Sequence, residues 1–302
     1  MSLVRFTHSD ALSPLLHTQC KKEDGLARRS VFNKAVARMQ HEAMLIAKKA
    51  YQQLYRQTPG LYVFVAGMQR SGTNMLMDVL ERSRETDMYH ESDARAFDNY
   101  GMRPSSVIHR LGAASHAPVF VIKALCELDQ LKSLMTTFSP AKTVWMVRDY
   151  TDAVSSALVS FKNFALQVSR IAQDRNANGW RGRGMSDATH ALVRSLYTPD
   201  MDDATAAGLI WYFRNVLYFE QQLASDERVL LAHYENLVTA SQREFSRIFE
   251  FLGLRYTPFV SSQVFASSIH RREPPAIAAP VRELCEDLSA RFRALSNPTC
   301  TG

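Results

Sequence analysis

Short apolar runs alternate with longer stretches of helical character along most of the chain. The runs are apolar at consecutive positions and rich in β-branched residues, a pattern typical of strands buried on both faces. Strands are expected at 61–66, 119–122, 143–147 and 228–233, with a further possible strand at 88–90. Helices are expected at 75–82, 127–138, 150–168, 203–224 and 238–252. This alternation predicts an α/β fold with a mostly parallel central sheet flanked by helices.

The first 58 residues differ from this pattern and are expected to form an N-terminal helical extension. Residues 1–25 are polar and irregular, whereas apolar positions between Val31 and Tyr55 recur with a helical period. Pro59 and Gly60 end this helix. We therefore predict an N-terminal arm and helix over 1–58 and one main domain over 59–302. The helix packs on the core or, alternatively, meets a partner chain.

Composition narrows the class of protein. The chain has 302 residues, of which 46% are hydrophobic and 22% charged, so it can bury a sizeable core. Its formal net charge of +6 favours an anionic partner. The sequence has no block of five basic residues and no zinc-knuckle or RRM-like signature, which argues against nucleic-acid binding.

Three further features bear on where the protein acts. Its four cysteines lie far apart and include no CxxC pair, which is typical of reduced thiols in an intracellular protein. The first ten residues lack the basic-then-apolar order of a signal peptide. No apolar run approaches the roughly 18 residues that indicate a membrane span. We expect a cytoplasmic protein without a membrane span.

A turn with the sequence GMQRSGTN, at 67–74, lies between an expected strand and an expected helix. In such a turn, backbone N–H groups and the helix N-terminus can bind a phosphate or sulfate group. Gly72 permits a tight turn and a close approach of the backbone to the anion. Ser71 and Thr73 add hydroxyl donors, and Arg70 adds a fixed positive charge. The sequence therefore predicts a P-loop-like anion cradle.

The cradle departs from the Walker A pattern GxxxxGK[ST] at two positions. Thr73 stands where that pattern has its lysine, and Asn74 stands where it has Ser or Thr. The usual contacts to the β- and γ-phosphates and to Mg²⁺ are therefore missing. An ATP-dependent kinase or NTPase of the P-loop type is the alternative that these two departures disfavour.

A second motif follows the expected strand at 143–147. Arg148 stands at the end of that strand, and Ser156 stands eight positions later on the expected helix. An arginine can fork onto phosphate oxygens, and a hydroxyl on the helix can donate from the adjacent side. Over about residues 61–273, the two motifs together resemble the sulfotransferases that use 3′-phosphoadenosine 5′-phosphosulfate (PAPS). Tyr150 is a departure, because many members of the family have proline there.

The resemblance implies specific roles for these residues. The cradle from Arg70 to Asn74 would hold the 5′-phosphosulfate, and Arg148 with Ser156 would hold the 3′-phosphate that distinguishes PAPS from ATP. Near the C-terminus, the segment 267–272 corresponds to the place where members of the family have a serine and basic residues that cover the nucleotide. Ser268 and Arg271 are the residues carried over there. The product would be 3′-phosphoadenosine 5′-phosphate (PAP), and no metal is expected.

Two candidates compete for the catalytic base. Glu91 lies 21 positions after Arg70, the distance at which the similar tyrosylprotein sulfotransferases place their catalytic glutamate. His90 is the rival, because cytosolic small-molecule sulfotransferases use a histidine, although theirs follows a later strand. A carboxylate at position 91 can accept the proton of an attacking hydroxyl. Lys123 matches the strand-end lysine of the tyrosylprotein enzymes and would stabilise charge on the leaving phosphate.

The most consistent interpretation is in-line sulfuryl transfer from PAPS to a hydroxyl acceptor, with Glu91, Lys123 and Arg70 as catalytic residues. The acceptor is a peptide, a glycan or a small molecule. A binding scaffold that has lost its chemistry is a further alternative, against which Glu91 and Lys123 argue. The glycines and arginines of 178–184 suggest a mobile basic loop, either a lid or a plain connection.

Overall fold

The computed structural model describes residues 36, 38–265, 269 and 272–296. The chain divides into two units, Met1–Tyr51 and Gln52–Gly302. Helical backbone runs over 38–54, which confirms the predicted N-terminal helix over its described part. Within the second unit, the side chain of Gln52 donates hydrogen bonds to the backbone oxygens of Arg84 and Thr86, both at 2.9 Å.

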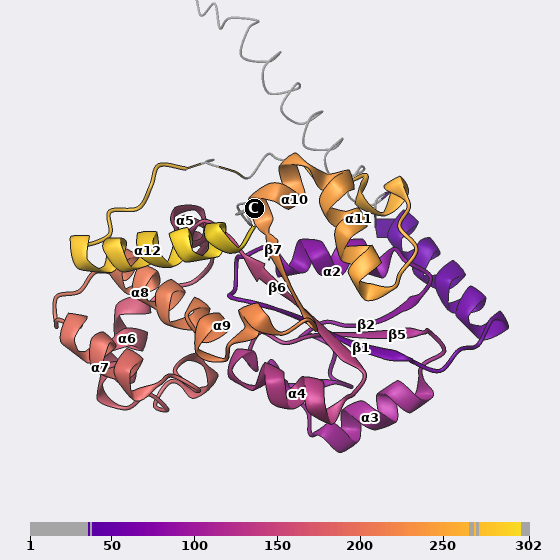
Figure 1. The fold of residues 1–302 in the computed structure, drawn as a ribbon, viewed down its shortest axis with the longest axis horizontal. Helices are drawn as coiled ribbons and strands as arrows, with labels where there is room; N and C mark the ends of the chain where they lie inside the picture. The colour runs from indigo at the N-terminus through magenta and orange to yellow at the C-terminus, as the bar shows by residue number, and fades with distance from the viewer. Residues whose placement is uncertain (1–35, 37, 266–268, 270–271, 297–302) are drawn as a thin grey trace, which may run out of the picture. The chain divides into compact units, whose positions relative to one another are not determined.

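A five-stranded sheet with parallel pairing throughout forms the centre of the second unit (Figure 1). Its spatial order is β2–β5–β1–β6–β7. The strands are β1 (Leu61–Gly67), β2 (Thr86–Tyr89), β5 (Val119–Lys123), β6 (Ala141–Val147) and β7 (Val229–His233). The predicted strands and the mostly parallel sheet are thus confirmed. From β1 the chain adds β2 and β5 on one side of the sheet and then β6 and β7 on the other side. The carboxyl ends of β1 and β6 therefore form a topological switch point, where open α/β sheets bind ligands.

Alternate residues of each central strand face two separate hydrophobic cores. On one face, Val63 and Val65 of β1 pack with α2 (Thr73–Glu81) and α11 (Ser241–Leu252). On the other face, Phe64 and Ala66 pack with α3 (Ser105–Ala114) and α4 (Leu131–Thr137). Figure 1 shows these helix pairs on opposite sides of the sheet. Burial on both faces explains why the strands are apolar at consecutive positions.

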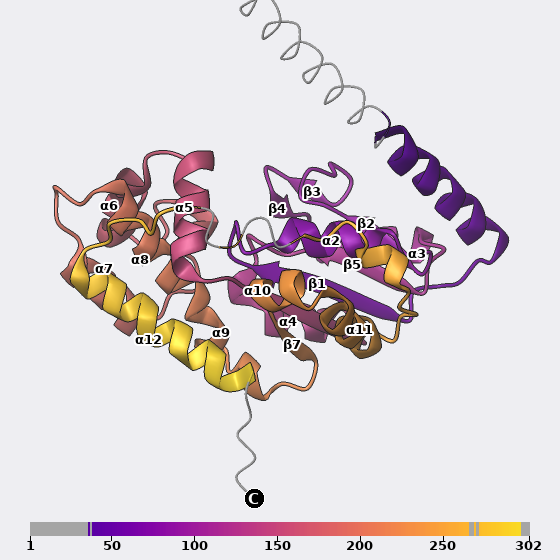
Figure 2. The same cartoon turned by 90° about the horizontal axis from the view of Figure 1, so that it is seen from above.

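The core that contains Phe64 and Ala66 continues into a cluster of helices beside the sheet (Figure 2). The cluster contains α5 (Tyr150–Ser160), α6 (Phe164–Gln173), α7 (Asp187–Leu196), α8 (Asp203–Asn215), α9 (Leu217–Glu220) and α12 (Ala279–Ser296). Two predictions are wrong here, because the helices expected at 150–168 and 203–224 are both interrupted. The first breaks at Asn163, whose φ of 64° is left-handed and redirects the chain into α6. The short hairpin of β3 (Phe97–Asp98) and β4 (Gly101–Met102), and the helices α3, α7 and α12, were not predicted.

The segment 178–184, which was expected to be a mobile loop, is held against the domain by hydrogen bonds of arginine side chains. It contains a short 3₁₀ turn over Gly179–Arg181. The guanidinium of Arg183 pairs with Asp129, with Nε 2.9 Å from Oδ2, and Nη2 donates to the Cys126 oxygen at 2.7 Å. The buried Arg214 donates to the Trp180 oxygen at 2.9 Å. The segment is therefore bound to the rest of the domain by hydrogen bonds from Arg183 and to Trp180.

Cys126 and Cys285 are free and buried, and burial raises the pKa of the Cys126 thiol to about 12. None of the helices in the described parts of the chain combines the length and the apolar character that crossing a bilayer requires.

Candidate functional site

The turn between β1 and α2 has two positions, Gly67 and Gly72, that suit glycine and leave no room for a side chain. Gly67 and Gly72 have φ values of 135° and 90°, in the region that favours glycine. A Cβ atom at Gly72 would lie 2.3 Å from the ring of Tyr234, and one at Gly67 would lie 2.3 Å from the Met146 oxygen. Arg70 also has a positive φ, of 72°. The close approach of Tyr234 explains the glycine at position 72, and the turn leads directly into the N-terminus of α2.

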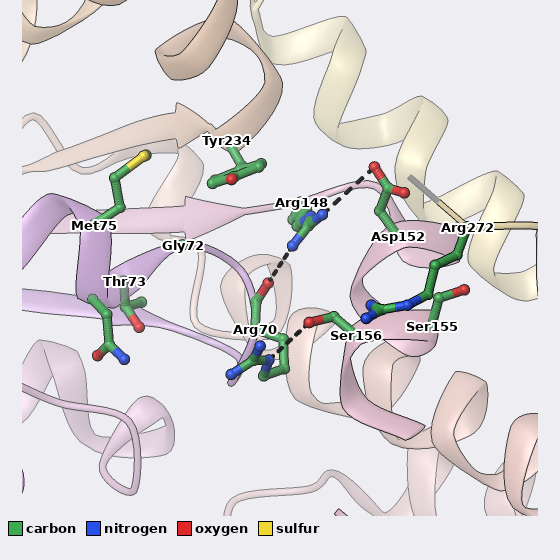
Figure 3. Close-up of a pocket in the computed structure, with 11 residues that line it drawn as sticks. Arg70, Gly72, Thr73, Met75, Arg148, Asp152, Ser155, Ser156, Tyr234 and Arg272 are labelled. Carbon is green, nitrogen blue, oxygen red and sulfur yellow. Dashed lines mark hydrogen bonds and ion pairs between the residues drawn. The ribbon is translucent and has the colours of Figure 1, made fainter. Parts of the chain in front are cut away.

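A cavity of about 370 Å³ opens in front of this turn (Figure 3). Among the described residues, its basic side chains are Arg70, Arg148 and Arg272, and its acidic side chain is Asp152. The other lining residues are Gly72, Thr73, Asn74, Met75, Ser155, Ser156 and Tyr234. Three guanidinium groups and several hydroxyls against one carboxylate give the cavity an excess of positive charge and hydrogen-bond donors. Such a lining suits an anionic ligand with phosphate or sulfate groups.

The two sequence motifs meet at this cavity. Arg70 donates from Nε to the Ser156 Oγ atom at 2.9 Å. Arg148 donates from Nη1 to the backbone oxygen of Arg70 at 3.3 Å, and its Nη2 lies 3.7 Å from Asp152 Oδ2. The guanidinium of Arg148 also stacks over the Tyr234 ring, 4.5 Å from its centre. Figure 3 shows Arg70, Arg148 and Ser156 converging on one space. The structure therefore brings together the three residues that the sequence analysis assigned to opposite ends of one nucleotide.

Ser71 lies differently from the other cradle residues. It is fully buried, its Oγ atom has no hydrogen-bond partner within the described parts of the chain, and it is not among the residues that line the cavity. Its backbone N–H donates to the Met68 oxygen at 3.2 Å. Ser71 was predicted to add a hydroxyl donor to the cradle, and the structure places it among the buried residues beside the cavity.

A second group of polar side chains adjoins the cavity through Asn74. Lys123, at the end of β5, is only 1% exposed and donates from Nζ to Asn74 Oδ1. The same ammonium group lies 2.5 Å from Glu91 Oε1 in a salt bridge. The other oxygen of Glu91, Oε2, is buried and has no hydrogen-bond partner in the described structure. Asn74 and Lys123 thus connect the anion-binding cavity to a carboxylate with one unused acceptor.

His90 points toward a different group. Its Nε2 atom lies 3.8 Å from Glu81 Oε1, at the end of α2. Glu91 directly follows it and contacts Lys123. The two rivals for the catalytic base therefore have different neighbours, and Glu91 is the one linked to the cavity.

The start of α5 is fixed by carboxylates that do not touch the cavity. Asp149 caps the helix, accepting from the N–H of Thr151 at 2.9 Å. Its own N–H donates to Glu235 Oε1 at 3.0 Å. Burial raises the pKa of Glu235. Tyr150, the departure from the family pattern, is the first residue of α5 and its hydroxyl donates to Glu286 at 3.3 Å. The polar cap thus starts the helix at the position where many family members have proline.

Five residues of the cavity were not predicted from the sequence, Met75 and four polar or charged residues, and two predicted residues lie outside the described residues. The latter two are Ser268 and Arg271, so their roles stay predictions. The four polar or charged residues are Asp152, Ser155, Tyr234 and Arg272. The sequence held signals for two of them: Asp152 follows Arg148 by one helical turn, and Arg272 closes the run of basic residues after Ser268.

Comparison with known proteins assigns the family. A profile of the sulfotransferase domain matches residues 62–271. The chain belongs to the sulfotransferase family, and its reaction is the transfer of a sulfuryl group. No curated protein sequence matches the chain.

Several solved structures are similar to the chain at low sequence identity. The sulfotransferase domain of the Synechococcus PCC 7002 olefin synthase has a TM-score of 0.46 and 13% identity, over 77% of this chain and 96% of that one. A sulfotransferase from Alicyclobacillus acidocaldarius has a TM-score of 0.44 and 16% identity, over 79% and 93% of the two chains. A mouse sulfotransferase in complex with PAP has a TM-score of 0.42 and 14% identity, over 78% and 88%.

Proposed function

We propose that the chain transfers the sulfuryl group of PAPS to the hydroxyl group of an acceptor, with Glu91 as the general base. One observation carries the proposal: a basic cavity for an anionic ligand is joined by Asn74 and Lys123 to the carboxylate of Glu91. The cavity that would bind the donor and the carboxylate that would accept the proton therefore adjoin each other, as an in-line transfer requires.

The lining of the cavity supports PAPS as the donor. Its volume of about 370 Å³ lies within the range of about 300–1,000 Å³ that small-molecule sites occupy. Arg70 and the N-terminus of α2 would hold the 5′-phosphosulfate. Arg148 and Ser156 would hold the 3′-phosphate, a group that ADP and ATP lack. Ser268 and Arg271 are proposed, from the sequence pattern alone, to contact the same nucleotide.

The chemistry uses three side chains of the chain. Glu91 accepts the proton of the acceptor hydroxyl on its carboxylate, while the hydroxyl oxygen forms a bond to sulfur. The bond between sulfur and the bridging phosphate oxygen breaks at the same time, and PAP leaves with that electron pair. Lys123 and Arg70 stabilise the negative charge that develops on the departing phosphate. The products are a sulfate ester, PAP and a proton held on Glu91.

Geometry favours Glu91 over His90 as the base. The carboxylate contacts the buried Lys123, whereas the imidazole of His90 lies beside Glu81. A base must reach the reacting hydroxyl near the donor, and Glu91 adjoins the cavity through Asn74. This choice agrees with the sequence pattern of the tyrosylprotein sulfotransferases, and membership of that branch stays a prediction.

The test is a transfer assay with radiolabelled PAPS against a panel of hydroxyl acceptors: a phenol, a tyrosine peptide, a monosaccharide glycoside and an oligosaccharide. We expect a labelled sulfate ester and stoichiometric PAP, with a rate that EDTA leaves unchanged. The same panel is incubated with γ-labelled ATP and Mg²⁺. Transfer of phosphate from ATP, with none of sulfate from PAPS, would contradict the proposal and restore the kinase alternative.

A further inference from the structure

A second cavity, of about 320 Å³, lies between α3 and α4 and has a mainly polar lining. The polar groups of its lining include those of Arg103, Ser105, Glu127, Ser133 and Thr137. None of these residues lines the first cavity, and none has a role in the proposed sulfuryl transfer. Its volume is close to the lower end of the range of about 300–1,000 Å³ that is usual for small-molecule sites.

Glu127 is a buried carboxylate with one unused oxygen. The residue is 7% exposed, and its Oε1 atom accepts from the Met102 N–H at 2.8 Å. Its Oε2 atom is buried and has no hydrogen-bond partner in the described part of the chain. A buried carboxylate with an unsatisfied oxygen is costly, and because Glu127 lines the cavity, a ligand hydroxyl that donates to its carboxylate would reduce that cost. Burial also raises the pKa of Glu127, which agrees with an incompletely satisfied carboxyl group.

Groups that favour a negative charge lie in the same cavity. Arg103 makes one side-chain hydrogen bond within the described residues, from Nε to the Ala94 oxygen at 2.9 Å. Its two terminal NH₂ groups are therefore available for a carboxylate or sulfate fork. The ten-residue helix α3 begins at Ser105, and no side chain caps its first N–H groups. Both features suit an anionic group, whereas Glu127 suits a hydroxyl donor.

Two segments that line this cavity follow Glu91 and Lys123 in the chain. Arg103 follows Glu91 by twelve positions, after the hairpin of β3 and β4. Glu127 follows Lys123 by four positions, beyond the end of β5. Arg183 closes the cavity from the segment 178–184, held there by Asp129. Part of the lining thus lies within twelve positions of Glu91 or Lys123 in the chain.

We propose that this second cavity binds a sugar acid unit of the acceptor, with its hydroxyls on Glu127, Ser133 and Thr137 and its acid group on Arg103 and the α3 N-terminus. A ligand that is rich in hydroxyls and also anionic uses both kinds of group. A neutral lipid or an apolar phenol would leave the carboxylate and the guanidinium unsatisfied. This inference rests on the proposed function, because it names the acceptor of that reaction.

The test measures binding of methyl β-D-glucuronide to the full chain by ligand-observed NMR, with and without saturating PAP. Methyl β-D-glucoside, which lacks the carboxylate, is the matched ligand. We expect the glucuronide to bind at least about fivefold more tightly than the glucoside, since a charge-assisted bond is worth more than a neutral one. Glu127→Gln and Arg103→Met should each weaken glucuronide binding about tenfold. The control variants Glu250→Gln and Arg194→Met, at exposed positions on α11 and α7, should leave it unchanged.

Calorimetry with PAP on the same samples separates this inference from the proposed function. PAP binding without any glucuronide binding would overturn the sugar acid assignment and leave the donor site standing. Equal binding of glucuronide and glucoside, or equal losses in the control variants, would overturn it as well. Failure of PAP to bind would contradict the donor assignment, while the response of glucuronide binding to Glu127→Gln and Arg103→Met would still decide the second cavity.

Discussion

Arg70 and Ser156 are joined by a hydrogen bond of 2.9 Å, although 86 residues separate them in the chain. The bond connects the turn after β1 to the helix after β6, and so joins the two segments that were assigned to opposite ends of PAPS. Arg148 strengthens this connection by donating to the backbone oxygen of Arg70. The two halves of the proposed donor site therefore share hydrogen bonds, and a change in one half is expected to alter the other.

The first prediction concerns Ser156→Ala. This variant removes the acceptor of the Arg70 bond and one hydroxyl of the cavity, so it should raise the Kd of PAP about tenfold. Isothermal titration calorimetry measures the change. Ser195→Ala, at an exposed position on α7, is the matched control and should bind PAP like the wild type. If the two variants bind PAP equally, Ser156 has no part in the donor site.

The second prediction separates Glu91 from His90. Glu91→Gln keeps the shape of the side chain and removes the base, so kcat should fall about 10²- to 10⁴-fold. The Kd of PAP should change little, because Glu91 does not line the donor cavity. His90→Gln should retain most of kcat. Steady-state rates and calorimetry on both variants provide the check, and a large loss of kcat in His90→Gln alone would reverse the assignment.

Gly72→Ala tests the packing of the cradle. A Cβ atom at this position would lie 2.3 Å from the Tyr234 ring, and the φ of 90° strains any other residue. Gly179→Ala is the matched control, since Gly179 also has a positive φ, of 61°, but nothing lies within 4 Å of an added Cβ. Overpacking costs about 1–3 kcal/mol, so Gly72→Ala should be less stable than Gly179→Ala by that amount. Urea denaturation measures the difference, and equal stabilities would show that Tyr234 moves aside freely.

The fourth prediction follows from the buried Glu235. Burial raises the pKa of its carboxyl above the value of 4.5 that it has in the unfolded chain. The folded state therefore binds more protons than the unfolded state, and the free energy of unfolding falls as the pH rises from below 4.5 through the raised pKa. Glu235→Gln keeps an acceptor for the Asp149 N–H and removes the titration, so its free energy of unfolding should fall less over this range.

Urea denaturation from about pH 4 to pH 7 measures both slopes. Glu250→Gln, an exposed change of the same kind on α11, should follow the wild-type slope. A wild-type slope that Glu235→Gln does not alter would mean that Glu235 titrates alike in the folded and unfolded chains.

The fold could be predicted from the sequence wherever the signal is local. Burial on both faces makes β1, β5 and β6 apolar at consecutive positions, so these strands were readable without any knowledge of their neighbours. The break between α5 and α6 could not be predicted from the sequence, because it depends on the left-handed conformation of Asn163. Asparagine adopts that conformation only in some contexts, and here the packing of α6 into the core requires it.

The site was predictable to the extent that its residues belong to contiguous motifs. Arg70, Arg148 and Ser156 stand in short motifs with fixed spacing, and the cavity contains all three. Tyr234 enters the cavity from the segment after β7 through its contact with Gly72, a relationship that no local pattern contains. Ser71 was expected to add a hydroxyl donor to the cradle, and it is fully buried, a property that the short motif does not reveal.

Calorimetry with PAP and ADP tests the proposed recognition of the 3′-phosphate of PAPS by Arg148. The wild type should bind PAP at least about 100-fold more tightly than ADP, since a fork of charge-assisted bonds contributes about 3 kcal/mol or more. Arg148→Met should lose this preference and bind the two nucleotides about equally, while Arg194→Met keeps it. Equal binding of PAP and ADP by the wild type, or a preference for PAP that survives in Arg148→Met, would contradict this proposal.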